Sequence, residues 1–146
     1  MTYLKNTIFY EDVLHEINYS FGNYYLFNDF VIAEMHEGVI VNWEQHGKRI
    51  VDDISQFYEN RNDNPQNIVY ISNRVNSYSV KPTDWLKFYK NNHSMKAYGI
   101  VSYDDTGFLN ALLEKLFVKT DFNRYGSLER AIEWAKTLAI TRSLAS

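Results

Sequence analysis

The chain of 146 residues has no cysteine, two prolines and six glycines. Without cysteine it forms no disulfide, no thiolate metal site and no cysteine nucleophile. No apolar run approaches the roughly 20 residues that a membrane-spanning helix requires. The N-terminus also lacks the charged segment followed by an apolar block that marks a signal peptide. We therefore expect a soluble cytoplasmic protein without a transmembrane segment.

Positive charge is not in excess either. The 15 Lys and Arg residues are outnumbered by 18 Asp and Glu residues, for a formal net charge of −3. Nucleic-acid binding requires a basic footprint, so this balance argues against it. With 45% apolar residues the chain can build one packed core, and we expect a single domain over residues 1–146. The 16% of aromatic residues indicates a ring-rich core or, alternatively, a tyrosine-rich contact surface.

The most informative stretch is Asn67–Arg74, a short β-branched and aromatic run that ends in polar residues. A continuous apolar run of this length is typical of a strand buried on both faces of an α/β sheet. An irregular polar loop, residues 75–82, follows it. In open α/β sheets ligands and partners usually bind at this carboxyl end of the strands.

The other segments predict the architecture. Alternation in residues 13–21 and short runs at 24–27 and 30–36, separated by turn residues, predict an antiparallel meander. Further strands are expected at 96–103 and 118–125, and helices at 42–58, 83–91, 105–117 and 127–139. This order predicts a layered α/β fold in which the meander leads into a mixed sheet with four helices packed on it.

Several details of the helices follow from the same pattern. We expect Asn42 and Gln45 to form a capping box, and Gly47 to allow close approach of the first helix to the sheet. Thr83, Asp105 or Thr106, and Ser127 are the expected caps of the later helices. The third helix is expected to bury an apolar stripe made by Leu109, Leu112, Leu113, Leu116 and Phe117. The three tryptophans are expected to pack in the core: Trp43, Trp85 and Trp134.

Four features then carry a resemblance to a known family: Gly38 before the first helix, the strands Ile68–Ser72 and Ala97–Val101, and the terminal segment Leu128–Trp134. In their order and spacing, residues 30–138 resemble the STAS domain group, specifically its bacterial SpoIIAA-like branch. The resemblance implies a SpoIIAA-like layered fold and a small non-catalytic module, as in anti-sigma-factor antagonists, transporter tails and sensors. The SpoIIAA-like branch also implies binding of apolar or lipid-like molecules.

In STAS antagonists a serine after the central strand is phosphorylated to control partner binding. This chain departs from that pattern, because the strand ends Ser72-Asn73-Arg74 and no Asp-Ser pair precedes the next helix. Ser77, Ser79 and Thr83 are therefore positional candidates for phosphorylation only.

The expected binding site lies where the two central strands end. If they are parallel neighbours, their polar residues meet at one edge of the sheet, and we call this set the predicted rim: Ser72, Asn73, Arg74, Tyr78, Ser102 and Asp104. Helix N-termini near Thr83 and Thr106 would favour an anionic ligand, and Arg74 suits a carboxylate or phosphate. Alternatively, Arg74 pairs with Asp104 or Asp105. Tyr78 is expected as an exposed contact residue in the loop.

No nucleophile elbow, phosphate loop or metalloprotease motif occurs, and the four histidines lack metal-ligand spacing, although His15 and His36 could face each other across the meander. We expect no enzyme activity, no metal and no cofactor; an enzyme would rest on Ser72, Arg74 and the neighbouring Asp104 and Asp105 alone. The leading hypothesis is a regulatory module that binds a protein partner through residues 74–81. The alternative is a carrier or sensor of a small apolar ligand held between sheet and helices. A homodimer through the edge strand of the meander is a further expectation.

Overall fold

A mixed six-stranded sheet forms the centre of the molecule, in the order β1-β2-β3-β5-β7-β8. The computed structural model describes residues 1–145. The strands are β1 (His15–Tyr19), β2 (Gly22–Leu26), β3 (Phe30–Met35), β5 (Val69–Asn73), β7 (Ala97–Val101) and β8 (Asp121–Tyr125). β2 runs antiparallel to both of its neighbours, β1 and β3, whereas β3, β5, β7 and β8 are parallel. The predicted meander and the mixed α/β sheet are thus confirmed.

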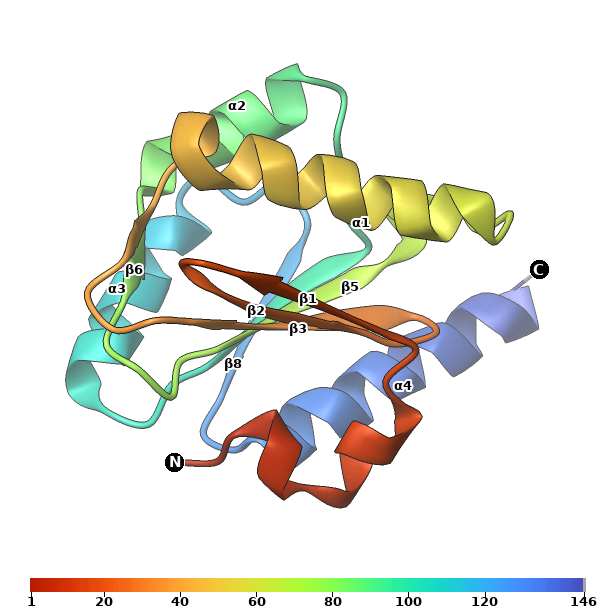
Figure 1. Ribbon diagram of the computed structural model, residues 1–146, viewed down its shortest axis with the longest axis horizontal. Helices are drawn as coiled ribbons and strands as arrows, with labels where there is room; N and C mark the ends of the chain where they lie inside the picture. The colour runs from red at the N-terminus through yellow and green to blue at the C-terminus, as the bar shows by residue number, and fades with distance from the viewer. Residues whose placement is uncertain (146) are drawn as a thin grey trace.

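Helices cover both faces of this sheet (Figure 1). α1 (Lys48–Asn60) and α2 (Trp85–Lys90) lie on one face, and α4 (Leu128–Ala145) lies on the other. Short helical turns precede two of them: η3 (Trp43–Gly47), a π-helical turn, and η5 (Pro82–Asp84). α3 (Asp105–Lys115) lies near a small parallel pair formed by β4 (Ile40–Val41) and β6 (Ser79–Val80). A 3-10 turn, η4 (Pro65–Asn67), leads into β5.

Packing on the α4 face depends on small residues. Ala131 and Ala135 of α4 are fully buried against the sheet. A Cβ atom at Gly99 of β7 would lie 2.7 Å from the ring of Trp134, so only glycine leaves room for this tryptophan. Trp134 therefore packs on the sheet as predicted, and the glycine allows the close approach.

α1 buries the predicted stripe, represented by Ile50, Ile54 and Tyr58. Asn42 caps η3, the turn that leads into α1, because its Oδ1 accepts the Gln45 N–H at 2.9 Å while its Nδ2 donates to Gln45 Oε1 at 3.2 Å. The expectation for Gly47 was wrong. A Cβ atom there would meet the ring of Trp43 at 3.0 Å rather than the sheet.

The predicted buried stripe of α3 is also wrong. Its leucines are exposed, with 60%, 46%, 52% and 76% of the surface accessible at Leu109, Leu112, Leu113 and Leu116. The residues that α3 buries are Ala111 and Glu114. The helix is turned this way because Glu114 forms a buried ion pair with Arg74, described below.

Other caps lie close to their predicted positions. Asp104, not Asp105 or Thr106, caps α3 by accepting the Gly107 N–H at 2.7 Å. Ser127 caps α4 as expected, accepting the Arg130 N–H at 3.2 Å. Thr83 is not a cap, because the Pro82 turn places it inside η5 with its side chain exposed.

The N-terminal segment is ordered against the sheet, which the sequence did not indicate. Two 3-10 helices, η1 (Leu4–Asn6) and η2 (Ile8–Asp12), lie on the α4 side. Leu4 is fully buried and donates its N–H to Glu34 Oε2 at 2.9 Å. Asn73 Nδ2 donates to the same oxygen at 2.7 Å. Burial raises the pKa of Glu34, although these two hydrogen bonds oppose the shift.

A Glu34→Gln variant tests this arrangement. A carboxyl whose pKa is raised in the folded state contributes most to the stability of the protein below the ordinary glutamate pKa of about 4.3. This contribution is lost as pH rises through the pKa of the folded state. Glutamine keeps an acceptor oxygen for both donors without the buried charge. We expect the variant to gain stability relative to wild type as pH rises from 4 to 7, roughly. Thermal unfolding across this range measures the difference, and a difference independent of pH would contradict the prediction.

Candidate functional site

The two central strands end side by side. β5 and β7 are parallel, with Ser72 paired to Ile100 and Asn73 paired to Val101. The N–H of Arg74 then donates to the carbonyl of Val101 at 3.0 Å. The premise of the predicted rim, that these strands are parallel neighbours, is therefore confirmed.

Arg74 turns inward rather than toward solvent. Its guanidinium forms a buried ion pair with Glu114 of α3, and the two side chains are 3% and 1% exposed. The expected pairing with Asp104 or Asp105 is wrong, because the chain folds Glu114 over the end of β5. Burial alone would lower the pKa of Arg74, but the charge of Glu114, the neighbouring Tyr98 and Tyr78 and the hydrogen bond to Glu114 together outweigh it and raise the pKa, so the guanidinium stays charged.

Hydroxyl and indole groups surround this ion pair. Arg74 Nε donates to Ser72 Oγ at 3.2 Å, and Nη2 donates to the Tyr98 hydroxyl at 3.3 Å. Glu114 Oε1 accepts from Tyr98 at 3.0 Å and from Trp85 Nε1 at 3.3 Å. Buried charges are stable only when such hydrogen bonds satisfy them. Within the described residues, Arg74 Nη1 remains buried without a hydrogen-bond partner.

Tyr78 is buried, with 6% of its surface exposed, so the prediction of an exposed contact residue is wrong. The Arg74 guanidinium lies 5.1 Å from the centre of its ring, and its hydroxyl shares a hydrogen bond with Ser72 Oγ. Burial raises the pKa of Tyr78, so it stays a neutral phenol. The polar loop thus buries its aromatic residue, Tyr78.

An apolar cavity of about 100 Å³ adjoins these groups, between the sheet and helices α1 and α2. Its floor is made by strand residues such as Tyr24, Ala33 and Ile71, and its opposite wall by helical residues such as Ile50 and Phe88. The volume exceeds the roughly 30 Å³ share of one water molecule in the liquid. It is somewhat smaller than an engineered apolar cavity of about 150 Å³ that binds benzene. A compact molecule of at most single-ring size matches this space.

Four phenols face the same region: Tyr24, Tyr70, Tyr78 and Tyr98 all line the cavity. Tyr78 and Tyr98 are engaged with the ion pair, as described above. Tyr24 is 7% exposed, and its hydroxyl has no hydrogen-bond partner among residues 1–145. Burial raises the pKa of Tyr24 well above its ordinary value, so it offers a neutral donor and acceptor. The same holds for Tyr70, so the cavity combines apolar walls with two hydroxyls that form no hydrogen bond within the described residues.

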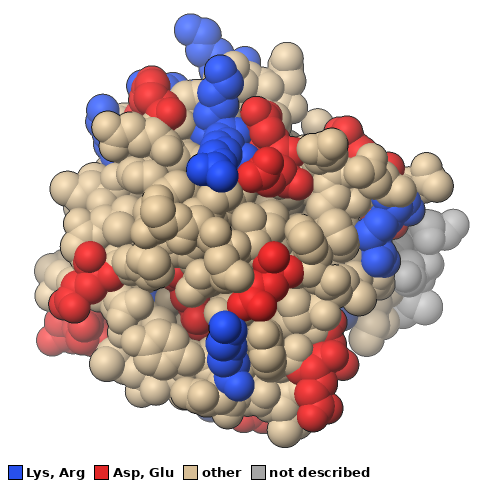
Figure 2. Space-filling model, viewed as in Figure 1, with Lys and Arg blue, Asp and Glu red and all other residues tan. Residues whose placement is uncertain are grey.

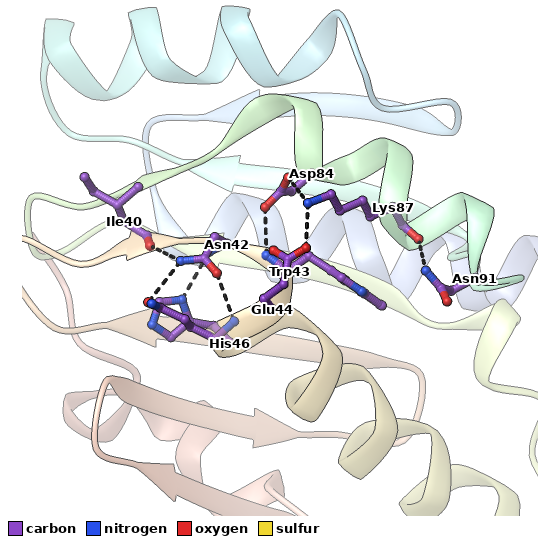
Figure 3. Close-up of polar contacts among 9 residues, drawn as sticks. Ile40, Asn42, Trp43, Glu44, His46, Asp84, Lys87 and Asn91 are labelled. Atoms are coloured by element: carbon purple, nitrogen blue, oxygen red, sulfur yellow. Dashed lines mark hydrogen bonds and ion pairs between the residues drawn. The ribbon is translucent and has the colours of Figure 1, made fainter.

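The turn η3, which leads into α1, is joined to η5 and to the start of α2 beside this cavity (Figure 3). Trp43 N–H donates to Asp84 Oδ2 at 2.8 Å, and Lys87 Nζ contacts Glu44 Oε1 at 2.6 Å and Asp84 Oδ1 at 3.5 Å. His46 Nδ1 accepts the Asn42 N–H at 3.1 Å, and burial lowers the pKa of His46. Trp43, Asp84 and Asn42 line the cavity, so these contacts hold its border in place.

The predicted rim is split between two places. Ser72 and Tyr78 line the apolar cavity. Arg74, Tyr78, Ser102 and Asp104 line a separate polar hollow of about 310 Å³ at the carboxyl ends of β5 and β7. Asn73 lines neither, because it points to the opposite face of the sheet and bonds Glu34.

The remaining candidates are dispersed. Ser77 is exposed beside the polar hollow, Thr83 is exposed in η5, and Ser79 is half-buried in β6. His15 begins β1 and stacks on Phe57, whereas His36 follows the other end of β3, so their expected approach is wrong. No group of three His, Asp or Glu residues within the described part of the chain could hold a metal ion.

Two important residues were missed. Glu114 was not among the predicted residues, and Tyr24 was predicted only as the first residue of a short strand. A signal for Glu114 exists, because it lies on the helix face opposite the leucines, yet periodicity does not say which face turns inward. For Tyr24 the sequence carries no signal beyond its strand position.

No protein-family model, curated protein or solved structure matches this chain. Its class therefore rests on the fold and the site: an α/β domain with an apolar cavity beside a buried ion pair. Among residues 1–145, no helix has the length and apolar character needed to cross a membrane.

The ion pair can be tested by unfolding in urea. Glu114→Gln leaves the Arg74 guanidinium buried beside a neutral amide, which should lower the free energy of unfolding by about 3–5 kcal/mol. Asp104→Asn is the control, because asparagine still caps α3 and the change should stay within about 0.5 kcal/mol. Replacing both partners, Arg74→Met with Glu114→Leu, should recover most of the loss. Equal losses in Glu114→Gln and Asp104→Asn would contradict the assigned pair.

Proposed function

We propose that this chain is a non-catalytic binding module of the STAS, SpoIIAA-like type that holds a small apolar molecule between its sheet and helices α1 and α2. The observation that carries the proposal is the apolar cavity of about 100 Å³ in that position. Apolar pockets with a few convergent polar groups are the usual form of small-molecule sites. The order of strands and helices, with β5 and β7 parallel, supports the likeness to STAS domains.

The polar groups at the cavity define which ligand it suits. Tyr24 and Tyr70 supply hydroxyls without a partner in the described chain, while Ser72, Tyr78 and Tyr98 are bonded within the ion-pair cluster. Arg74 is already neutralised by Glu114, so it offers no net charge to an anion. The preferred ligand is therefore a neutral ring or short chain with one hydroxyl or carbonyl group.

The geometry favours ligand binding over the two other hypotheses. In the loop expected to contact a protein partner, Arg74, Val75 and Tyr78 are buried. For an enzyme, Asp104 is engaged as a helix cap, and the cavity lining includes no histidine and one carboxylate, Asp84, bonded to Trp43. Placement in the cytoplasm belongs to the same proposal, supported by the cysteine-free composition.

Phenol and benzene are suitable probes, because they differ by one hydroxyl. Tyr24→Phe removes one of the two uncommitted hydroxyls, the one between the sheet and α1, with little change of shape, so phenol should bind roughly three- to tenfold more weakly while benzene binds equally well. The free variant should be as stable as wild type or more stable. Isothermal titration calorimetry measures both affinities, and thermal unfolding measures stability.

Tyr98→Phe is the matched control. Its hydroxyl is committed to Glu114, so this variant should lose about 1 kcal/mol or more of stability and keep the phenol-to-benzene affinity ratio of wild type. Failure of wild type to bind either probe, or an unchanged ratio in Tyr24→Phe, would count against the proposed site.

A further inference from the structure

The outer face of α3 is an apolar stripe on the surface. Leu109, Leu112, Leu113 and Leu116 are 46–76% exposed, and Phe108 is 40% exposed beneath the guanidinium of Arg124, 5.0 Å from its ring centre. These positions recur at the spacing of one helix face. Leucines exposed singly need no explanation, but a contiguous stripe of this kind marks an interaction surface.

Ordinary folding would turn such a stripe inward. Here the inward side of α3 carries Ala111 and Glu114, fixed by the ion pair with Arg74. The stripe therefore cannot rotate toward the sheet without leaving a buried Arg74 unpaired, which is strongly unfavourable. The leucines are held outward, where only another molecule can cover them.

The charges at the two ends of α3 select the partner. Asp104 and Asp105 stand at its N-terminal end, and Lys115 and Lys119 stand at and just beyond its C-terminal end. Two copies of α3 packed antiparallel would place the acidic end of each against the basic end of the other. The two helix dipoles would also oppose each other favourably. The stripe itself carries no charge between Phe108 and Leu113 that such packing would bury.

We propose that this face binds a second copy of the chain, in an isologous dimer built on an antiparallel pair of α3 helices. Leu112 and Leu113 lie near the two-fold axis, and Leu109 of one copy contacts Leu116 of the other. The isologous arrangement is the commonest symmetry of homodimers. A helix of 11 residues makes a small interface, so dissociation in the micromolar range follows.

This interface differs from the edge strand β1 that the sequence suggested, where the polar residues His15 and Asn18 are exposed. Charged side chains are scattered over the face shown in Figure 2, with neither sign dominating it. The proposal does not depend on a ligand in the cavity, so it stands or falls separately from the proposed function.

Sedimentation equilibrium over a micromolar concentration series tests the dimer. Wild type should show a monomer–dimer equilibrium, and Leu113→Lys should raise the dissociation constant at least about tenfold. Because Leu113 is 52% exposed, the variant should fold normally, as circular dichroism would check. Ile8→Lys is the matched control: Ile8 is 79% exposed in η2, away from α3, and its replacement should leave the equilibrium unchanged.

Introduced thiols test the geometry, because the chain has no cysteine of its own. Leu113→Cys should form a disulfide-linked dimer by itself. Leu109→Cys should not, but it should cross-link to Leu116→Cys when the two variants are mixed. Efficient self-linking of Leu109→Cys would overturn the antiparallel pairing. A wild type that stays monomeric throughout, including one that instead floats with phospholipid vesicles, would overturn the dimer.

Discussion

The buried ion pair between Arg74 and Glu114 is the interaction on which the rest of this structure depends. Removing two charges from water costs several kcal/mol per ion, and the attraction between them offsets this only when the remaining donors and acceptors are satisfied. Ser72, Tyr98 and Trp85 supply most of those hydrogen bonds, and Arg74 Nη1 alone of the two side chains' polar atoms has no partner within the described residues. The pair therefore fixes two further features of the structure. It orients the wall of the cavity, and it determines which face of α3 packs against the sheet.

The cavity lowers the stability of the protein. By the scale measured for core cavities, about 100 Å³ of empty apolar space costs on the order of 2 kcal/mol. Ala33 is a small residue among the larger side chains that line this space. The hydroxyls of Tyr24 and Tyr70, which form no hydrogen bond within the described residues, can each bond a ligand in the cavity. A ligand that fills the space and bonds one of these hydroxyls gains both apolar contacts and a hydrogen bond, which is the physical basis of the proposed binding.

Local patterns predicted much of the fold, because they report local physics. The apolar runs of β5 and β7, the stripe of α1 and the cap at Asn42 are each decided within a few residues, and all were confirmed. What failed was decided at a distance. Periodicity showed that α3 has an apolar stripe, but its direction depends on Arg74, 40 positions away in sequence. The burial of Tyr78 follows from the same contact. The order of the N-terminal segment depends on Glu34, and short 3-10 turns carry no periodic signal of their own.

The two proposed sites meet at Glu114. This carboxylate holds α3 against the sheet from one side and bonds Tyr98 and Trp85, which line the cavity, from the other. α3 buries little else, since Ala111 is its other buried residue. The ion pair is thus the main contact that holds α3, so a second copy bound to the outer face of this helix would act on the same carboxylate that positions the cavity wall. Binding free energies coupled in this way are reciprocal. Any change that dimerisation makes in the ligand-binding free energy, through Tyr98 and Trp85, is therefore matched by an equal change that the ligand makes in the dimerisation free energy.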